Sequence, residues 1–470
     1  MLKKISLITC LLFALTAGSM AAKGPKYVFI FIGDGMGIGS VQATDIYQKL
    51  QYGPDTSLLM MRFPVAGFST TYCLNKWETD SPAAGTAIAN GVKTMYGYQG
   101  IGKEGQPLTS FFQVMKKQGR GIGVLTTNAP DDATPAAFYA SVKNRNQRYQ
   151  IATDAAKSGF DFFGGARWRG DKAQDAKELP VHELMKQHGY AIAEGMDEFA
   201  GIKEQDKVIL LSQDTTDMNA IGLMIDEKPG ALKLSEMTQA CLDHLTKRYS
   251  KKGFCMMVES GDIDHTNHVK DVASTIHEVL EFEKAIGIAY DFYRRYPKET
   301  LIIVTADHET GGLTVGANSS SYSANLAYAQ HQKVSEITFG KQLSQLIKEQ
   351  TPITWPDMKT QLTEKFGFWK GIPLTLTDEA RLMTAFEKSC LRRQGKTTKT
   401  LYNSFDEFTI EIFNILNDKM AIGWTTWSHT GNPVPFFAAG AGSSAFSGVI
   451  DNAQIVNILY DLMGLKNPNL

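Results

Sequence analysis

Three short apolar runs of the sequence end close to a carboxylate. They are residues 27–32, followed by Asp34; residues 254–258, followed by Glu259; and residues 301–305, followed by Asp307. A single acid after a strand is commonly a turn residue or a helix cap. Ligands in open α/β sheets bind outside the carboxyl ends of the strands, and three acids at such ends would converge there. The pattern therefore favours a metal site over three unrelated turns.

Histidines near these acids indicate which metals would bind. Asp264 and His268 are four residues apart, so a helical turn would place both on one face. His308 directly follows Asp307, and His429 begins the sequence His-Thr-Gly. Mixed imidazole and carboxylate ligands suit zinc, whereas an all-oxygen set suits magnesium. His429 alone would be interpreted as a structural histidine.

A glycine-rich stretch at residues 33–39 follows the first apolar run and invites comparison with a dinucleotide-binding loop. It does not match the G-x-G-x-x-G pattern, and Asp34 within it would repel a pyrophosphate. A turn that carries a metal ligand explains the stretch better.

Ser81 is the candidate nucleophile. Small residues follow Ser81 and Pro82, and we expect a helix with Ser81 at its N-cap and Pro82 as its first residue. Capping would be enough to explain a lone Ser-Pro pair. The functional alternative is a serine whose oxyanion is stabilised by the helix N-terminus and a metal. No G-x-S-x-G elbow surrounds Ser81, which argues against a serine-hydrolase triad.

The composition excludes several classes of protein. The chain has 470 residues, 48 Lys and Arg against 49 Asp and Glu, and a formal net charge of -1. Without a basic excess it does not resemble a nucleic-acid-binding protein. The body of the chain has no run of roughly 18 apolar residues, so we expect no stable membrane span.

Apolar runs alternate with amphipathic stretches along the chain. Candidate buried strands lie at 27–32, 121–126, 208–211, 254–258 and 301–305, with a weaker one at 435–439; candidate helices lie at 108–118, 232–249 and 274–295. This alternation predicts an α/β three-layer sandwich with a mostly parallel central sheet flanked by helices. Residues 309–428 contain helical patterns at 334–349, 378–387 and 405–417 but no strong strand run. We interpret them as a long insertion that forms a cap or crown; a second small domain is the alternative.

The first 22 residues have the pattern of a secretory signal peptide. Lys3 and Lys4 precede an apolar stretch at 5–17 and then small residues. We therefore expect a periplasmic or secreted protein whose single domain, residues 23–470, carries the insertion at about 309–428. The four cysteines after residue 22 do not have metal-knuckle spacing, and Cys255 within an apolar run is expected to be buried.

Several motifs together resemble the alkaline phosphatase family. They are FIFIGDGMG at 29–37, TDSPAAGTA at 79–87, NGVKT at 90–94, DATPAAF at 132–138, VESGDIDHTNH at 258–268, TADHETGG at 305–312 and SHTG at 428–431. They occur in the order typical of that family and extend from about residue 27 to about residue 440. The resemblance implies an enzyme that hydrolyses phosphate monoesters through a phosphoserine intermediate at Ser81.

The resemblance also implies a site with two zinc ions and one magnesium ion. The first zinc would bind Asp264, His268 and His429; the second would bind Asp34, Asp307 and His308 and face Ser81; and magnesium would bind Asp34, Thr134 and Glu259. Arg145 would clamp the phosphate, because its planar fork matches two phosphate oxygens. Asp132 would lie near the magnesium, and His265 would touch phosphate through water at most. A homodimer is expected, with a monomer as the alternative.

Two other functions compete with a monoesterase. A phosphodiesterase could use the same metal-binding residues, but Arg145 would engage an oxygen that is blocked in a diester. A catalytically idle binding protein is the second alternative. The crowded acids argue against it, because such acids are costly to bury without a metal.

Overall fold

The computed structural model describes residues 24–171, 178–216, 220–226, 230–317, 322–349 and 352–470. The predicted signal peptide lies outside the described residues. Within them no helix is both long and apolar enough to cross a membrane. Cys73, Cys241, Cys255 and Cys390 are unpaired, and Cys255 is buried as predicted.

The described residues form a ten-stranded sheet in the order β16-β2-β15-β8-β1-β7-β3-β4-β6-β5. Its strands are β1 (Tyr27–Gly33), β2 (Val65–Thr70), β3 (Gly121–Thr126), β4 (Phe162–Gly165), β5 (Tyr190–Glu194), β6 (Lys207–Leu211), β7 (Phe254–Ser260), β8 (Thr300–Thr305), β15 (Val434–Gly440) and β16 (Gly448–Asp451). Only β15 runs antiparallel to its neighbours. The predicted mostly parallel sheet is therefore confirmed.

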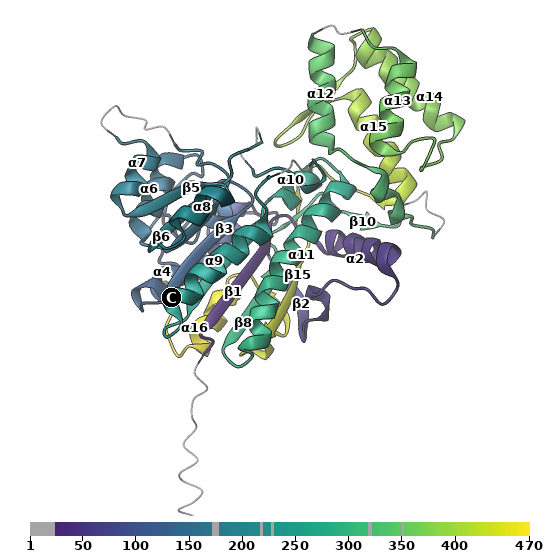
Figure 1. The fold of residues 1–470 in the computed structure, drawn as a ribbon. Coiled ribbons are helices and arrows are strands. Elements are labelled where there is room, and N and C mark those ends of the chain that lie inside the picture. Colours follow the sequence, from purple (N-terminus) through teal and green to yellow (C-terminus); the bar gives the residue numbers. More distant parts are fainter. Residues whose placement is uncertain (1–23, 172–177, 217–219, 227–229, 318–321, 350–351) are drawn as a thin grey trace, which may run out of the picture.

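Helices cover both faces of this sheet (Figure 1). In β1, Val28, Ile30 and Ile32 join one buried apolar cluster, whereas Tyr27, Phe29 and Phe31 join another, as strand alternation requires. The first cluster includes residues of α3 (Ser81–Asn90), α4 (Phe111–Lys117), α6 (Arg148–Ser158), α7 (Val181–Gln187) and α16 (Gln454–Leu462). The second includes residues of α2 (Ile38–Tyr52), α8 (Met196–Ile202), α9 (Leu234–Tyr249) and α11 (Val272–Arg295). The molecule is thus the expected three-layer sandwich.

The sequence patterns missed β2, β4, β5 and β16. The β4 strand is only Phe-Phe-Gly-Gly, too short to stand out as an apolar run. The edge strand β5 has only its first and fourth residues buried. The β2 strand contains a glycine and exposes a phenylalanine, Phe68. These strands form because neighbouring strands offer hydrogen-bonding partners, which is a tertiary effect that local composition does not reveal.

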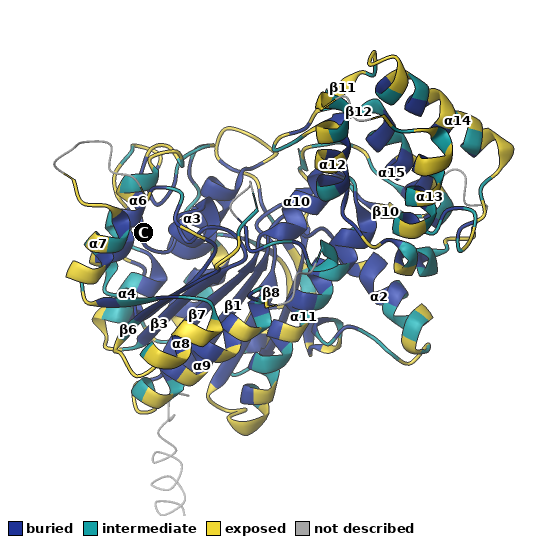
Figure 2. Ribbon diagram, turned by 45° about the horizontal axis from the view of Figure 1, so that its top comes forward, coloured by how far each residue is buried: buried dark blue, intermediate teal, exposed yellow. Residues whose placement is uncertain are grey.

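Residues 309–428 fold around helices α12 (Glu336–Lys348), α13 (Trp355–Phe366), α14 (Leu376–Phe386) and α15 (Glu407–Met420). Their apolar faces form a third cluster, which also includes Ala43 and Tyr47 of α2 and Val272 of α11. In Figures 1 and 2 these helices stand above α2 at one side of the sandwich, with exposed outer surfaces. The predicted helices at 334–349, 378–387 and 405–417 correspond to α12, α14 and α15, whereas α13 was missed.

The remaining elements are short. They are the helices α5 (Ala133–Ala136) and α10 (Asp262–His268); the strands β9 (Glu309–Thr310), β10 (Thr314–Val315), β11 (Thr397–Lys399), β12 (Ser404–Asp406), β13 (Ile422–Gly423) and β14 (His429–Thr430); the 3-10 helices at Met60–Arg62, Met224–Asp226, Leu326–His331 and Ser443–Phe446; and a π-helical turn at Glu387–Leu391. Several of them carry the side chains of the candidate site.

Candidate active site

The three acids predicted to converge do lie at one edge of the sheet. Strand β1 lies between β7 and β8, and Ile32 is level with both Glu259 and Thr305. Asp34 and Asp307 follow directly beyond this level, where the chain leaves the sheet. The acids lie together because the three strands are parallel neighbours, as the sequence pattern predicted.

Gly35 allows the turn after β1 to fit between these acids. Its φ is +67°, a conformation that side chains other than glycine rarely adopt. A Cβ atom at this position would lie 2.6 Å from Oδ1 of Asp264. The Gly35 amide also donates a hydrogen bond to Oδ1 of Asp307, at 3.2 Å. Asp34, Asp264 and Asp307 can therefore approach one another around a residue without a side chain.

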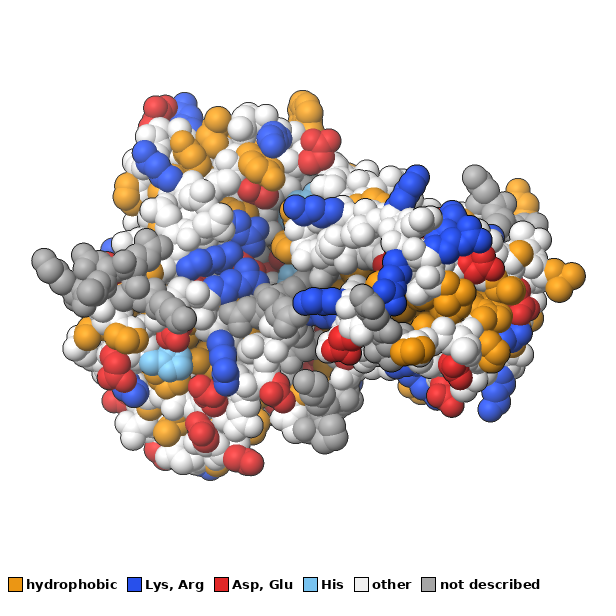
Figure 3. Space-filling model, turned by 90° about the horizontal axis from the view of Figure 1, so that it is seen from above, with side chains coloured by type: hydrophobic (Ala, Val, Ile, Leu, Met, Phe, Trp, Pro, Cys, Tyr) orange, Lys and Arg blue, Asp and Glu red, His pale blue; other side chains and the backbone are white. Residues whose placement is uncertain are grey.

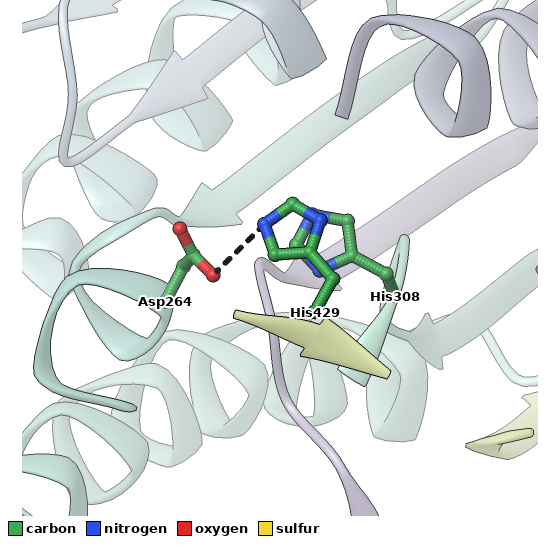
Figure 4. A group of neighbouring side chains, drawn as sticks. All are labelled: Asp264, His308 and His429. Atoms are coloured by element: carbon green, nitrogen blue, oxygen red, sulfur yellow. Dashed lines mark ion pairs between the residues drawn. The ribbon is translucent and has the colours of Figure 1, made fainter. Parts of the chain in front are cut away.

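Helix α10 and the β9–β14 pair bring the histidines to the same place. Asp264 and His268 lie on one face of α10, with Oδ2 of Asp264 3.4 Å from Nε2 of His268. His429 pairs with Thr310 across β14 and β9. Its ring therefore stacks on that of His308, with the centroids 3.6 Å apart. Figure 4 shows both rings beside Asp264, whose Oδ1 lies 3.9 Å from Nε2 of His429.

Each of these three histidines is held through its Nδ1 atom. Nδ1 of His268 donates to the carbonyl of Trp427, and Nδ1 of His429 donates to the carbonyl of Thr79, both at 2.7 Å. Nδ1 of His308 lies 3.2 Å from Oγ1 of Thr310. That hydroxyl donates its own proton to Asp264, so it accepts from the histidine. All three Nε2 atoms thus face the acids, and a neutral histidine in this arrangement can ligate a metal through Nε2.

The side chains form two groups that could each hold a cation. Asp34, Asp307 and His308 have ligand atoms within 4.8 Å of one another, and so do Asp264, His308 and His429. The first group matches the predicted second zinc site. In the second, His308 occupies the place expected of His268, although His268 also contacts Asp264.

Buried polar atoms without partners support a cation at this site. Among the buried atoms that have no hydrogen-bond partner within the described residues, five lie on predicted metal ligands: Oδ1 of Asp34, Oγ1 of Thr134, Nε2 of His268, Oδ2 of Asp307 and Nε2 of His429. Such atoms are rare in the interior of proteins because leaving them unpaired is costly. The carboxylate, hydroxyl and imidazole atoms gathered here are of the types that bind zinc and magnesium, so the residues present fit these metals.

The electrostatics of the site agree with this interpretation. Burial raises the pKa of Asp34 well above its usual range, and the charges of Asp307, Asp264 and Glu259 raise it further. Burial also raises the pKa of Glu259 and of Asp307. Burial lowers the pKa of His308, which keeps its imidazole neutral. A bound cation would relieve the repulsion between the acids and would use the neutral imidazole as a ligand.

Ser81 begins helix α3, but it is not the N-cap residue, so that prediction was wrong by one position. Asp80 is the N-cap: its backbone is extended, and its carboxylate accepts the amide of Ala83 at 3.3 Å. An aspartate competes well for this position for two reasons. Its carboxylate accepts a hydrogen bond from a free helix amide, and its negative charge interacts favourably with the positive end of the helix dipole. The Ser81 hydroxyl is therefore not used for capping and lies 3.2 Å from Nε2 of His308.

The proposed magnesium ligands Glu259 and Thr134 come from β7 and from the segment that follows its neighbour β3. Glu259 is level with Thr126, the last residue of β3, whose hydroxyl donates to the Glu259 carboxylate. Thr134 lies in the short helix α5 that follows β3, and its buried hydroxyl has no hydrogen-bond partner among the residues that the structure describes. Both residues therefore offer oxygen atoms, the ligand type that magnesium prefers.

Arg145 contacts Asp132, and two arginines that the sequence analysis missed share this contact. The guanidinium groups of Arg145, Arg148 and Arg169 lie 2.7, 3.1 and 3.3 Å from the same Asp132 oxygen. Although burial opposes it, the charges of these arginines hold the pKa of Asp132 well below its usual range. Asp132 thus orients Arg145. Viewed from above, Lys and Arg side chains gather beside a hollow in which histidine is visible (Figure 3).

Thr310 and Tyr402 are further residues of the site that the motifs did not reveal. Thr310 bridges His308 and Asp264. Tyr402, from residues 309–428, places its hydroxyl 3.4 Å from Oδ2 of Asp264. Thr310 could have been suspected from its position two residues after His308, but nothing in the sequence around Tyr402 indicates this contact. His265 lies at the edge of the site, with Nδ1 2.9 Å from Oδ1 of Asp262.

Comparisons with known proteins agree with this architecture. A family model described as alkaline phosphatase matches residues 25–163 and 170–465. Alkaline phosphatase 4 of Bacillus subtilis is 28% identical over 451 residues, which cover 93% of this chain and 88% of the relative. The crystal structure of a cold-active alkaline phosphatase from a psychrophilic Shewanella species superposes with a TM-score of 0.77 at 27% identity, covering 93% of this chain and 99% of that one. The Thermus thermophilus alkaline phosphatase, 24% identical with a TM-score of 0.75, shares the fold over 95% and 93% of the two chains. The chain therefore belongs to the alkaline phosphatase family and is a phosphomonoester hydrolase.

Proposed function

We propose that this enzyme is an exported phosphatase that transfers the phosphoryl group of a monoester to Ser81, at a site for two zinc ions and one magnesium ion. The observation that carries the proposal is the contact of the Ser81 hydroxyl with His308, whose ligand atom groups with those of the buried acids Asp34 and Asp307. Asp34, Asp307 and His308 would hold one zinc, and Asp264, His268 and His429 the other. Asp34, Thr134 and Glu259 would hold the magnesium.

Arg145 would bind the substrate phosphate. Its Nη2 atom donates to Asp132 at 2.7 Å, which leaves other donors of the guanidinium for phosphate oxygens. Asp132 is held in turn by Arg148, so the fork is oriented before the substrate arrives. Pre-orientation reduces the entropy lost on binding.

Ser81 would then attack phosphorus. When bound, the metal ions would supply Lewis acidity, which favours the serine alkoxide and neutralises charge on the leaving oxygen. The new Oγ–P bond forms as the bond from phosphorus to the ester oxygen breaks, and the alcohol leaves. The hydroxyl lies at the first residue of α3, whose N-terminal end favours negative charge. Water then attacks the phosphorus of the phosphoserine, the Oγ–P bond breaks, inorganic phosphate leaves and the Ser81 hydroxyl is restored.

Residues 309–428 would act as an insertion that caps the site. Their apolar cluster, which packs on α2 and α11, and the contact of Tyr402 with Asp264 support this assignment. Export after removal of residues 1–22 and a homodimer rest on the sequence pattern and on the family resemblance. N-terminal sequencing of the exported protein and light scattering of the purified enzyme would test these two assignments.

The activity is tested by comparing a monoester with a matched diester. Steady-state rates on 4-nitrophenyl phosphate and on bis(4-nitrophenyl) phosphate would be measured with and without a chelator. We expect the monoester to be strongly preferred, with both rates lost on chelation. Preference for the diester would favour the phosphodiesterase alternative. A diester has one fewer free phosphate oxygen, so such a preference would mean that Arg145 does not bind two free oxygens of the substrate.

A further inference from the structure

Tyr402 reaches the candidate active site from residues 309–428. Its hydroxyl lies 3.4 Å from Oδ2 of Asp264. Its ring meets the rings of His265 and His268 edge to face, with centroids 4.8 and 5.1 Å apart. The residue remains partly exposed.

The loop that carries Tyr402 is firmly held. It joins β11 to β12, and the Thr400 amide donates to the carbonyl of Asn403 across the turn, at 2.8 Å. Phe405, in β12, is buried against Val269 and Ile337. Val269 directly follows His268, so the apolar contact anchors the loop to the end of helix α10. The position of Tyr402 relative to Asp264 is therefore fixed by packing.

The position of Ser81 defines which part of a substrate Tyr402 would meet. Ser81 contacts His308, which groups with Asp34 and Asp307. In phosphoryl transfer the attacking and leaving oxygens lie on opposite sides of phosphorus. Under the proposed function Ser81 faces Asp34, Asp307 and His308. The leaving oxygen would then point towards Asp264, His268 and His429, and Tyr402 contacts the first two of these residues.

We propose that the ring of Tyr402 contacts the alcohol portion of the substrate and makes the enzyme favour esters with an aromatic leaving group. The inference rests on the proposed function and adds a substrate class to it. Edge-to-face contacts between aromatic rings are favourable, and a ring held in place by its neighbours loses little entropy on contact. A methyl leaving group is too small to use such a surface.

The test compares 4-nitrophenyl phosphate with methyl phosphate in metal-loaded enzyme. In Tyr402→Ala we expect the ratio of the two kcat/KM values, aryl over methyl, to fall about threefold to tenfold. Tyr402→Phe keeps the ring and should keep the ratio within about twofold of wild type. Tyr402→Leu, for use if the alanine variant does not fold, should lower the ratio as alanine does. Leu401→Ala, an exposed neighbour on the same turn, is the matched control and should leave the ratio unchanged.

Inhibition by inorganic phosphate distinguishes contact of Tyr402 with the alcohol portion from a purely structural role of Tyr402, because phosphate has no alcohol portion. Its inhibition constant should stay within about twofold in Tyr402→Ala. An unchanged aryl-to-methyl ratio in Tyr402→Ala would overturn the inference, and so would an equal fall of the ratio in Tyr402→Phe. If wild-type enzyme hydrolysed neither ester, the proposed function itself would fail. If the wild-type enzyme hydrolysed both esters and Tyr402→Ala left the aryl-to-methyl ratio unchanged, only the proposed role of Tyr402 would fail.

Discussion

The hydroxyl oxygen of Ser81 lies 3.2 Å from Nε2 of His308, 227 positions further along the chain. The opposite nitrogen of that histidine is held by Thr310, so its ring cannot turn away without losing a hydrogen bond. Nε2 is therefore next to both the candidate nucleophile and the carboxylates of Asp34 and Asp307. One histidine thus contacts both the proposed nucleophile and the proposed metal ligands, so the reactivity of Ser81 should depend on the bound metal.

Removal of metal should abolish activity on monoesters. The ions would supply several kcal/mol of transition-state stabilisation, so the rate should fall by about a thousandfold or more on dialysis against a chelator. Zinc together with magnesium should restore it, and magnesium alone should not. Elemental analysis of the restored enzyme should find two zinc ions and one magnesium ion per chain. Full activity in metal-free protein would rule out the assigned site.

Substitution of Arg145 should separate monoesters from diesters. Arg145→Ser should lower kcat/KM for 4-nitrophenyl phosphate by about tenfold to a hundredfold, because charge-assisted hydrogen bonds are worth roughly 1.5–3 kcal/mol each. The loss on bis(4-nitrophenyl) phosphate should be much smaller, since one oxygen is blocked. Lys143→Ser, an exposed change on the same segment, is the control. Equal losses on both substrates would show that Arg145 does not clamp the phosphate.

The sequence predicted most of the candidate site because its residues occur in short local patterns. Asp34, Glu259 and Asp307 follow apolar runs, and a parallel sheet brings such strand ends together without further information. The Arg148 and Arg169 contacts with Asp132 could not be predicted, because they depend on how loops fold over the strand ends. Tyr402 lies in a turn whose position is set by the packing of Phe405 on Val269, a contact between residues far apart in sequence.

Local sequence also explains why the Ser81 cap was assigned one residue too late. Asp80 and Ser81 are both favourable N-cap residues, and the Pro82 that follows is tolerated at either of the first two helical positions. The backbone amide of Gly97 donates a hydrogen bond to Oδ2 of Asp80 at 2.9 Å, and this bond helps to hold Asp80 in the N-cap position. That contact spans 17 residues and is not visible in the local pattern.

Glu283 should make the stability of the enzyme depend on pH. Burial raises the pKa of this carboxyl on α11 from 4.5 to about 7. Because the folded state holds the proton more tightly, its contribution to the free energy of unfolding is complete below about pH 4.5 and is lost as the pH rises through about 7. The loss amounts to about 3 kcal/mol.

The Glu283→Gln variant should remove this dependence, since the amide stays neutral. Urea unfolding with saturating metals should give similar midpoints for variant and wild type near pH 4.5, and a higher midpoint for the variant near pH 8. Asp291→Asn, on an exposed position of the same helix, is the control. A variant that is no more stable than wild type at the higher pH would contradict the buried, proton-binding state of Glu283.

The core of residues 309–428 should contribute to stability independently of the catalytic groups. Phe366 is fully buried, and its ring centroid lies 5.2 Å from that of Phe339 and 5.5 Å from that of Phe413. Phe366→Ala should lower the free energy of unfolding by about 3–5 kcal/mol through the cavity it leaves. Leu376→Ala, at an exposed position of α14, should have little effect. An unchanged unfolding midpoint in Phe366→Ala would show that this cluster does not stabilise the fold.

The covalent intermediate on Ser81 is the central claim, and it can be observed directly. Metal-loaded enzyme would be mixed with 4-nitrophenyl phosphate, quenched in acid within the first turnover and digested for mass spectrometry. We predict one phosphoryl group on the peptide that contains Ser81, and none in Ser81→Ala, which should also lose steady-state activity. A phosphorylated residue in the Ser81→Ala protein, or full turnover without Ser81, would contradict the account.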